Sequence, residues 1–423
     1  MIPSLCLLSI LVIAASGYGQ EVKEWGTIET VEDMIYPRYN HTATLLSTTG
    51  EVLVTGGTED GYGSLSSAEI YDPGTGSWRE SGTMECPRMR HTADEIEPGA
   101  VMVTGGFIGG DPSAHPSLVR HYSHTGSQSL ISTEIYWDGI WSSGPDMIRG
   151  RFWHDTAKLP SGDILVIGGL NVTEGALSSC EIFDVSEEEF REAASLNTAR
   201  ARFMTEVMPN GSVLITGGHD GFKKEPMSSC ELYLPDEDRW VYISPMNRPR
   251  GYHSSCLMSD GRVLVSGGFS SPTTPDWNDS EVYDPDKDEW TMAGNMKFPR
   301  HNHESTLLGN GYVLIIGGSN CMTGMCHSGI EYFDPETGGW NDTYQLAMGR
   351  KWNRATLLEN GDVLISGGLA CNYPQVSTDL FSPPELGNEL RDETVRFSSW
   401  AMFIATLGLL AVVNIAVAIH LRR

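Results

Sequence analysis

The chain has 423 residues, with 55 acidic against 28 basic side chains and a formal net charge of −27. This acidity excludes nucleic-acid binding through a general basic surface, and a hydrophobic content of 40% with 11 Trp excludes a disordered chain. The 47 glycines exceed the average share of about 7%, which indicates that many backbone positions need a residue without a Cβ atom.

Residues 1–19 have the pattern of a secretory signal peptide. An apolar run from Leu5 to Ala15 is followed by the small residues Ser16, Gly17 and Gly19, near which cleavage is expected. The alternative is a buried N-terminal strand or helix. A signal peptide would place the rest of the chain in the secretory pathway.

The next segment, residues 20–383, contains seven copies of one sequence unit. Each copy has a Gly-Gly doublet, and successive doublets are separated by 49, 63, 49, 50, 50 and 50 residues. A period near 50 is typical of a β-propeller made of four-stranded blades. The first glycines of the doublets are Gly56, Gly105, Gly168, Gly217, Gly267, Gly317 and Gly367.

Each unit contains the pattern of four strands. The doublet ends an apolar run such as EVLVTGG, which is typical of a strand buried on both faces. A run before it (HTATLL), a strand after it (AEIYDP) and a segment with a large aromatic residue supply the other three. The seventh unit has no aromatic residue after Phe381, whereas Trp25 precedes Met34 at the matching position. We therefore predict an all-β fold, a seven-bladed propeller closed by the N-terminal strand, which removes open sheet edges.

These units resemble the kelch repeat, and the galactose-oxidase-like type is the most similar, as in RGYHSSCLMSDGRVLVSGG from Arg250 to Gly268. The resemblance covers about residues 22–383; it implies the fold but not an activity, because propellers host many functions. Copper-radical oxidases of this type use a Tyr cross-linked to a Cys, a second Tyr beside a His, and a His from a domain after the propeller. Tyr252 has a matching context, but Phe203-Met204 stands where that Cys is expected. We therefore predict no copper-radical site, and no other metal, cofactor or catalytic residue.

Two charged residues recur at fixed positions in the units. Because an unpaired buried charge costs several kcal/mol, we expect seven buried ion pairs within or between the blades. The basic members are Arg38, Arg88, Arg151, Arg200, Arg250, Arg300 and Arg350, and the acidic members are Glu69, Glu134, Glu181, Glu231, Glu281, Glu331 and Asp379.

A His follows the repeated Arg by three residues in five units, and Phe203 and Asn353 replace it in the other two. We expect the imidazoles to bond a neighbouring blade. The residue before this position varies, and we expect it to lie, with the loop after the doublet, at one mouth of the central channel. The variable residues are Asn40, Arg90, Trp153, Arg202, Tyr252, Asn302 and Trp352.

The mouth is the predicted ligand-binding surface, because Trp, Tyr and Arg side chains are enriched where proteins recognise partners. The second unit is longer than the others, and its loop from Phe107 to Ser132 adds a further Arg. The alternative is ordinary packing at the blade edges. The predicted binding residues are Arg90, Arg120, Trp153, Arg202, Tyr252 and Trp352.

The C-terminal segment has the pattern of a membrane anchor. After a stalk at residues 384–399, residues 400–421 are almost entirely apolar, and residues 422–423 are basic. This predicts one transmembrane helix with a two-residue cytoplasmic tail, hence a single-pass type I protein of the plasma membrane or another secretory-pathway membrane. The alternative is a glycolipid-anchor signal, but such signals normally end in apolar residues.

Two further patterns agree with an extracellular or lumenal location. The N-glycosylation sequons lie at Asn40, Asn171, Asn210, Asn278 and Asn341. We also expect one disulfide among Cys321, Cys326 and Cys371, since an oxidising compartment permits it.

The sequence therefore predicts a membrane-anchored, non-catalytic recognition module that binds an extracellular protein or a glycan and no nucleic acid. The alternative is a carbohydrate-active enzyme that isomerises a sugar or sugar acid in the channel, with His253, Glu304 or Asp155 as candidate acids or bases.

Overall fold

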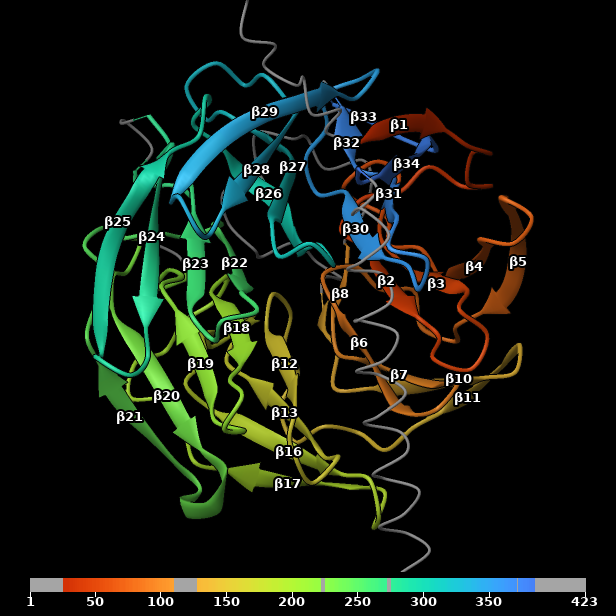
Figure 1. Ribbon diagram of the computed structural model, residues 1–423. Coiled ribbons are helices and arrows are strands. Elements are labelled where there is room, and N and C mark those ends of the chain that lie inside the picture. The colour runs from red at the N-terminus through yellow and green to blue at the C-terminus, as the bar shows by residue number, and fades with distance from the viewer. Residues whose placement is uncertain (1–25, 110–127, 222–224, 272–274, 371, 385–423) are drawn as a thin grey trace, which may run out of the picture.

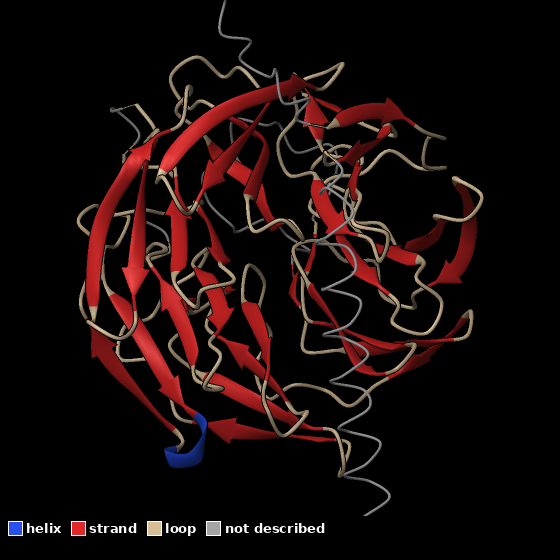
Figure 2. Ribbon diagram, viewed as in Figure 1, coloured by secondary structure: helices blue, strands red, loops and turns tan. Residues whose placement is uncertain are grey.

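The computed structural model describes residues 26–109, 128–221, 225–271, 275–370 and 372–384. Within these residues the protein consists of seven four-stranded antiparallel sheets arranged as blades around a central axis (Figure 1), and strands account for nearly all its regular structure (Figure 2). The predicted all-β, seven-bladed propeller is confirmed.

The strands of blades 1 to 4 follow one another along the chain. Blade 1 contains β2 (Thr42–Leu45), β3 (Val52–Thr55), β4 (Ser67–Asp72) and β5 (Ser77–Thr83). Blade 2 contains β6 (Thr92–Glu97), β7 (Ala100–Thr104), β10 (Thr133–Trp137) and β11 (Ile140–Ser143). Blade 3 contains β12 (Asp155–Lys158), β13 (Ile164–Ile167), β16 (Cys180–Asp184) and β17 (Glu189–Ala193). Blade 4 contains β18 (Met204–Val207), β19 (Val213–Thr216), β20 (Cys230–Leu234) and β21 (Arg239–Ile243), with the short 3-10 helix η2 (Pro235–Glu237) before its last strand.

Blades 5 to 7 complete the ring. Blade 5 contains β22 (Ser254–Leu257), β23 (Val263–Ser266), β24 (Asp279–Asp284) and β25 (Glu289–Asn295). Blade 6 contains β26 (His301–Leu307), β27 (Val313–Ser319), β28 (Gly329–Asp334) and β29 (Gly339–Gln345). Blade 7 contains β30 (Arg354–Leu357), β31 (Val363–Ser366), β34 (Thr378–Ser382) and β1 (Thr27–Thr30).

The ring is closed by the N-terminal strand, as predicted. Strand β1 pairs antiparallel with β34, so Thr27 lies opposite Ser382 and Thr30 lies opposite Asp379. In Figure 1 the red β1 lies beside the blue β34, at the junction of the first and last blades. Because the first and last segments share one sheet, blade 7 has four strands like the other blades, and the ring is closed across their junction.

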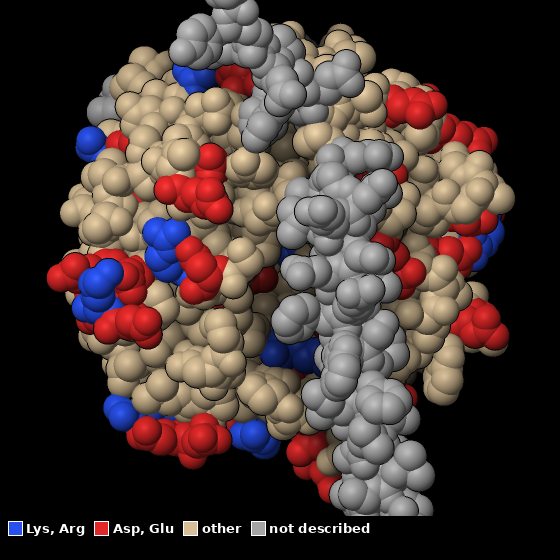
Figure 3. All heavy atoms as spheres, viewed as in Figure 1, with Lys and Arg blue, Asp and Glu red and all other residues tan. Residues whose placement is uncertain are grey.

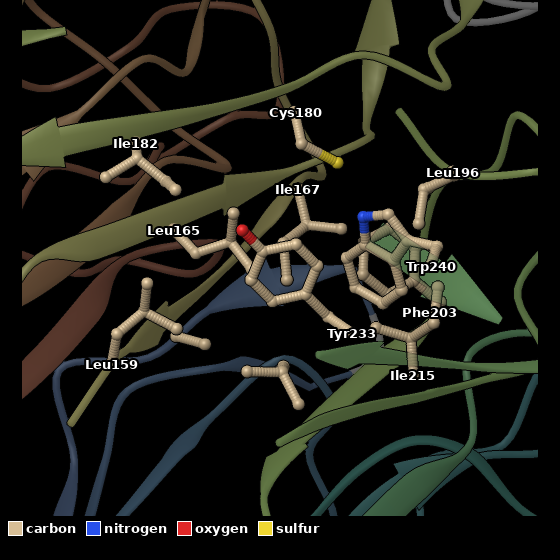
Figure 4. Packing of buried hydrophobic residues seen from close by; sticks show 12 residues of the cluster. Leu159, Leu165, Ile167, Cys180, Ile182, Leu196, Phe203, Ile215, Tyr233 and Trp240 are labelled. Atoms are coloured by element: carbon tan, nitrogen blue, oxygen red, sulfur yellow. The ribbon is translucent and has the colours of Figure 1, made fainter. Parts of the chain in front are cut away.

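The core lies between neighbouring blades. The second strand of every blade is buried on both faces, because its apolar run faces one blade on each side. Figure 4 shows the cluster between blades 3 and 4, where Ile167 and Cys180 face Phe203 and Trp240. The indole Nε1 of Trp240 donates to the carbonyl of Ala194 at 3.0 Å, and the repeated Trp of blades 1, 2, 5 and 6 likewise donates to a carbonyl of the preceding blade.

All seven predicted ion pairs are present, each within one blade. In blade 1, Arg38 Nη2 lies 2.5 Å from Glu69 Oε1, and both side chains are fully buried. Arg38 also donates to the doublet carbonyl of Gly56 at 2.8 Å, and Glu69 accepts the backbone N–H groups of Ile35 and Tyr36. Burial lowers the pKa of Arg38, and the nearby Glu69 charge opposes that effect. The other pairs are Arg88–Glu134, Arg151–Glu181, Arg200–Glu231, Arg250–Glu281, Arg300–Glu331 and Arg350–Asp379.

The five repeated imidazoles bond the preceding blade, as expected. His253 Nε2 lies 2.8 Å from Thr216 Oγ1, and His303 Nε2 lies 3.0 Å from Ser266 Oγ. Burial lowers the pKa of His253 to about 3. These histidines are therefore neutral at physiological pH and hold the blades together.

Several predictions fall outside the described residues. These are the signal peptide at 1–19, the greater part of the stalk at 384–399, the transmembrane helix at 400–421, the tail at 422–423, and Trp25. Within the described part of the chain, no helix is long and apolar enough to cross a membrane.

Candidate functional site

The seven variable residues predicted at the channel mouth share one unusual backbone conformation. All have a positive φ, between 50° and 60°, in the left-handed region that L-residues other than Asn, Asp and Gly rarely adopt. Asn302 lies near the start of β26, the other six stand just before the inner strands of their blades, and all seven are half-buried. We call this set the mouth ring: Asn40, Arg90, Trp153, Arg202, Tyr252, Asn302 and Trp352.

Backbone hydrogen bonds connect the mouth ring from blade to blade. The N–H of each member donates to the carbonyl of the member before it, over 2.9–3.4 Å, in six successive links from Asn40 to Trp352. All seven members share the left-handed conformation together with this pattern of links, whatever their side chains. The ring encircles a cavity of about 230 Å³ to which all seven members contribute. The predicted convergence of these residues at one mouth is confirmed.

Aromatic and basic side chains of the mouth ring stack in alternation. The guanidinium of Arg202 lies 3.2 Å from the ring centre of Trp153 and 4.1 Å from that of Tyr252. The guanidinium of Arg90 lies 4.0 Å from the centre of the same Trp153 ring. Each such contact contributes about 0.5–2 kcal/mol. Blades 2 to 5 therefore present one continuous cation–π stack.

The opposite side of the ring has a second stack. Trp352 packs on Tyr39 with ring centres 5.4 Å apart and an interplanar angle of 16°. The ammonium group of Lys351 lies 4.4 Å from the ring centre of Trp352, and burial lowers the pKa of this lysine. Figure 3 shows basic and acidic atoms inside the hollow at the centre of the molecule.

Carboxyl groups line the channel beyond the mouth ring. Asp155 and Glu304 border the cavity, and Asp94 and Glu206 lie two residues farther along their own inner strands. Burial raises the pKa of Asp155 to about 6, and those of Asp94 and Glu206 to about 7. Sequence reasoning named Asp155 and Glu304 only as possible acids or bases and missed the other two, because nothing in the repeat indicates which side chains converge in the channel.

Small hairpins follow the doublet in three blades and surround the same mouth. Each is joined to the segment just before an inner strand, as the bridges Met89–Phe107, Phe152–Leu170 and Lys351–Leu369 show. The hairpins are β8 (Phe107–Ile108) with β9 (Gln128–Ser129), β14 (Leu170–Asn171) with β15 (Gly175–Ala176), and β32 (Leu369–Ala370) with β33 (Tyr373–Pro374). Arg120, predicted in the long loop of the second unit, lies outside the described residues.

Two histidines lie near Tyr252, the residue whose sequence context resembles that of the copper-radical oxidases. The ring of Tyr252 has His219 at 5.3 Å and His301 at 6.1 Å between centres. The Nδ1 atom of His219 accepts the N–H of Gly221, and that of His301 is bonded to Asp276 at 2.8 Å. Across the described ranges, no three His, Cys, Asp or Glu side chains are grouped so that they could hold a metal ion.

The sequons differ in how accessible their amide groups are. The Asn171 and Asn278 side chains donate to the carbonyls of Gly150 and Met296, at 2.7 and 3.0 Å. In contrast, Asn210 and Asn341 are exposed. Glycosylation stays a prediction.

The predicted disulfide also stays a prediction. Among the described residues, Cys321 and Cys326 are not joined in a disulfide, and Cys371 lies outside the described residues. The sulfur of Cys326 lies 3.4 Å from the carbonyl oxygen of Leu369, so the loops of blades 6 and 7 are in contact.

Comparison with known proteins agrees with this architecture. The sequence matches the family model of the kelch motif at residues 37–85, 161–197, 207–247 and 250–297. The structure is similar to a novel fungal alcohol oxidase of the AA5 family solved with copper, at 16% identity and a TM-score of 0.66, over 86% of this chain and 77% of the oxidase. It is also similar to the protein YjhT, at 14% identity and a TM-score of 0.56, over 74% of this chain and 99% of YjhT. The chain is therefore a seven-bladed β-propeller that contains kelch motifs, and its fold is similar to that of an oxidase of the AA5 family.

Proposed function

We propose that this protein is a membrane-anchored, non-catalytic recognition module that binds a protein or a glycan through the mouth ring, on the extracellular or lumenal side. The observation that carries this proposal is the choice of side chains at seven equivalent left-handed positions. A left-handed residue other than Gly costs about 1–3 kcal/mol, with Asn among the best tolerated. Only Asn40 and Asn302 are Asn, whereas the other five are Arg, Trp or Tyr.

The backbone of the mouth ring does not explain these five residues. The same cross-blade link joins six successive pairs of blades, and all seven positions have the same φ. The conformation therefore belongs to the fold, and Asn would satisfy it in all seven blades. The large residues also differ from blade to blade, which is expected of a surface that contacts an asymmetric ligand. Aromatic and Arg side chains provide large contact areas with little loss of conformational entropy on binding.

An array experiment tests this function. Full-length protein, purified in detergent and labelled, is applied to a glycan array and to an array of extracellular proteins. We expect binding to a limited set of ligands and a loss of at least tenfold in affinity for the combined variant Arg90→Ala, Trp153→Ala, Trp352→Ala. Retained affinity in that variant, with the fold intact by circular dichroism, would rule out the mouth ring as the binding surface.

Membrane anchoring and orientation rest on the sequence patterns of the two ends and need a separate test. We expect the protein to fractionate with membranes and to shift in gel mobility after glycosidase treatment. No shift, together with extraction by salt alone, would contradict the secretory topology but would leave the mouth ring untouched.

A catalytic role is the second candidate, and the carboxyl groups of the channel favour it. Asp155, with its pKa raised to about 6 and its position on the cavity, is suited to proton transfer near neutral pH. His253, a candidate from the sequence, is unsuited because it is buried, neutral and bonded to Thr216. This role predicts turnover of a sugar or sugar acid that is lost in Asp155→Asn with the fold retained.

A further inference from the structure

Beyond the mouth ring, the inner strands carry more carboxyl groups than basic side chains. Asp155, Glu304 and Arg354 line the cavity together with Arg90 and Arg202 of the mouth ring, whose guanidinium groups are stacked on the Trp153 ring. Arg354 Nη1 lies 3.0 Å from Glu304 Oε1, and its Nε donates to the carbonyl of His41 at 2.9 Å. This arginine therefore compensates one carboxylate and also connects blade 7 to blade 1.

The remaining carboxyl groups have neutral partners nearby. Asp94 accepts a hydrogen bond from Thr156 Oγ1 at 3.0 Å, and Glu206 accepts one from Ser255 Oγ at 2.5 Å. Lys158 lies close enough to lower the pKa of Asp94, but it donates to the carbonyl of Glu95. Among the described residues beyond the mouth ring, these four carboxyl groups are therefore accompanied by one arginine, Arg354, and one more distant lysine, Lys158.

Asp155 lies at the centre of this group. Burial is the largest cause of the raised pKa values in this group; in addition, the Asp155 charge raises the pKa values of Asp94 and Glu206, and the Glu304 charge raises that of Asp155. Arg354, the Thr205 hydroxyl and the Thr156 N–H act in the opposite direction. Carboxyl groups that raise one another's pKa are those that gain most from a cation placed among them.

A buried amide provides an independent indication of a ligand. Asn353 replaces the repeated His in blade 7, is fully buried, and lines the same cavity. In five blades the corresponding His bonds a hydroxyl, and in blade 4 Phe203 packs with Ile167 of blade 3. In blade 6 the residue that corresponds to Ile167 is Ile316, which has no hydroxyl group to bond Asn353. Neither Nδ2 nor Oδ1 of Asn353 has a hydrogen-bond partner among the described residues.

An amide in this situation is costly unless something bonds it. A buried polar group without a partner costs about 1–3 kcal/mol, and blade 4 shows that an apolar pair fits the same place. The presence of Asn353 at this position therefore indicates that a polar group of a ligand bonds its amide in the cavity. Its Oδ1 accepts hydrogen bonds from N–H donors, which is the chemistry that the neighbouring carboxylates also require.

We propose that the ligand recognised at the mouth ring places an ammonium or guanidinium group in this cavity, where Asp155 and Glu304 receive its charge and Asn353 accepts one of its hydrogen bonds. This inference rests on the proposed recognition function and narrows the ligand to one with a positively charged nitrogen, such as an Arg or Lys side chain. An anionic group placed beside Asp155 and Glu304 would be repelled by both carboxylates, and a neutral group would leave their mutual repulsion unchanged.

A pair of probes that differ only in charge tests the proposal. Acetyl-arginine amide and acetyl-citrulline amide have nearly the same shape, but only the first carries a guanidinium group. Isothermal titration of the full-length protein should give a Kd of about 1 mM or tighter for the arginine probe and at least tenfold weaker binding for citrulline. Acetyl-arginine, which has a free carboxylate, is the third probe. If it binds more tightly than acetyl-arginine amide, the basic residues of the mouth ring also bind the carboxylate of the ligand.

Variants assign the binding to the cavity. We expect Asp155→Asn and Glu304→Gln each to weaken binding of the arginine probe at least tenfold, whereas Glu237→Gln, in an exposed pair with Arg239, leaves it unchanged. Asn353→Phe copies the pair of blade 4 and should weaken binding with the melting temperature retained. Near pH 6, binding should release protons, measured from the dependence of the heat on buffer ionisation, and Asp155→Asn should reduce that release.

The outcomes separate this proposal from the function on which it rests. Equal affinity for both probes, or no effect of Asp155→Asn and Glu304→Gln in folded protein, would overturn the cationic site. If neither probe binds while an array ligand without a cationic group binds through the mouth ring, the recognition function stands and this inference fails. If array ligands are insensitive to mouth-ring variants, the recognition function itself fails.

Discussion

The seven buried arginines and the seven residues of the mouth ring are both repeated once per blade, yet they differ in what is kept constant. Each buried arginine has the same partner type, and Arg200 donates to the doublet carbonyl of Gly217 as Arg38 does to that of Gly56. The mouth ring keeps only its backbone, with φ near 55° throughout, while its side chains vary. Constancy of a side chain indicates a structural role, and variation on a constant backbone indicates a surface available for recognition.

The largest effect should come from removing a buried arginine. Arg200→Met leaves Glu231, fully buried and 2.8 Å away in the native protein, without its countercharge. We expect a loss of about 3–5 kcal/mol in the free energy of unfolding, measured by urea denaturation. As a control, Arg149→Met removes an exposed partner of Glu174 and should cost less than about 1 kcal/mol. Similar losses in both variants would contradict the structural role of the buried pairs.

The doublet glycines should rank next. A Cβ atom on Gly217 would lie 2.3 Å from the carbonyl oxygen of Arg250, and its φ is +56°. Gly217→Ala therefore combines a steric clash with backbone strain, and we expect a loss of about 2–4 kcal/mol. Gly76 has φ +70° with nothing within 4 Å, so Gly76→Ala carries the strain alone, about 1 kcal/mol. Chemical denaturation of the two variants gives the difference, and equal losses would show that the close approach is unimportant.

The carboxyl groups of the channel should make stability depend on pH. The pKa of Asp94 is about 7 in the folded protein, above the ordinary value of 3.8, so the folded state retains a proton that the unfolded state has lost. This contribution to stability is complete below about pH 4 and disappears as the pH rises through 7. Asp94→Asn should remove that slope and stabilise the protein by about 1–2 kcal/mol at pH 8. Parallel pH profiles for Asp94→Asn, wild type and the surface control Asp146→Asn would contradict this assignment.

The smallest effect on stability should come from the mouth ring. Trp352→Asn loses the stack on Tyr39 but gains a residue that tolerates the left-handed conformation, so the two effects nearly cancel. We expect the free energy of unfolding to change by less than about 1 kcal/mol. Thermal and urea denaturation would measure this change. A loss comparable with that of Arg200→Met would mean that Trp352 is part of the scaffold.

Much of the fold could be predicted from the sequence because every unit repeats the same physical requirements. The doublets, the apolar strands and the recurring Arg and Glu gave the number of blades, the closing strand and all seven ion pairs. Their spacing along the chain also brought Arg90, Trp153, Arg202, Tyr252 and Trp352 to one mouth.

The finer organisation of the site depends on contacts between blades that spacing does not contain. Nothing in the sequence shows that Arg202 is held between Trp153 and Tyr252, or that Asp155 interacts with Glu206 across a blade boundary. The unusual Asn353 was visible as a departure from the repeated His, but its significance required the knowledge that Ile316 lies at the position of the usual hydroxyl. Departures from a repeat therefore indicate where to look, and three-dimensional contacts indicate what is there.

The difference in role between the buried arginines and the mouth ring is tested most directly with the double variant Trp153→Asn, Arg202→Asn. Its affinity for a ligand identified on the arrays and its free energy of unfolding are both measured. If the mouth ring serves recognition, affinity should fall at least tenfold while unfolding changes by less than about 2 kcal/mol. Unchanged affinity in this folded variant, or unfolding as severe as that of Arg200→Met, would contradict the account.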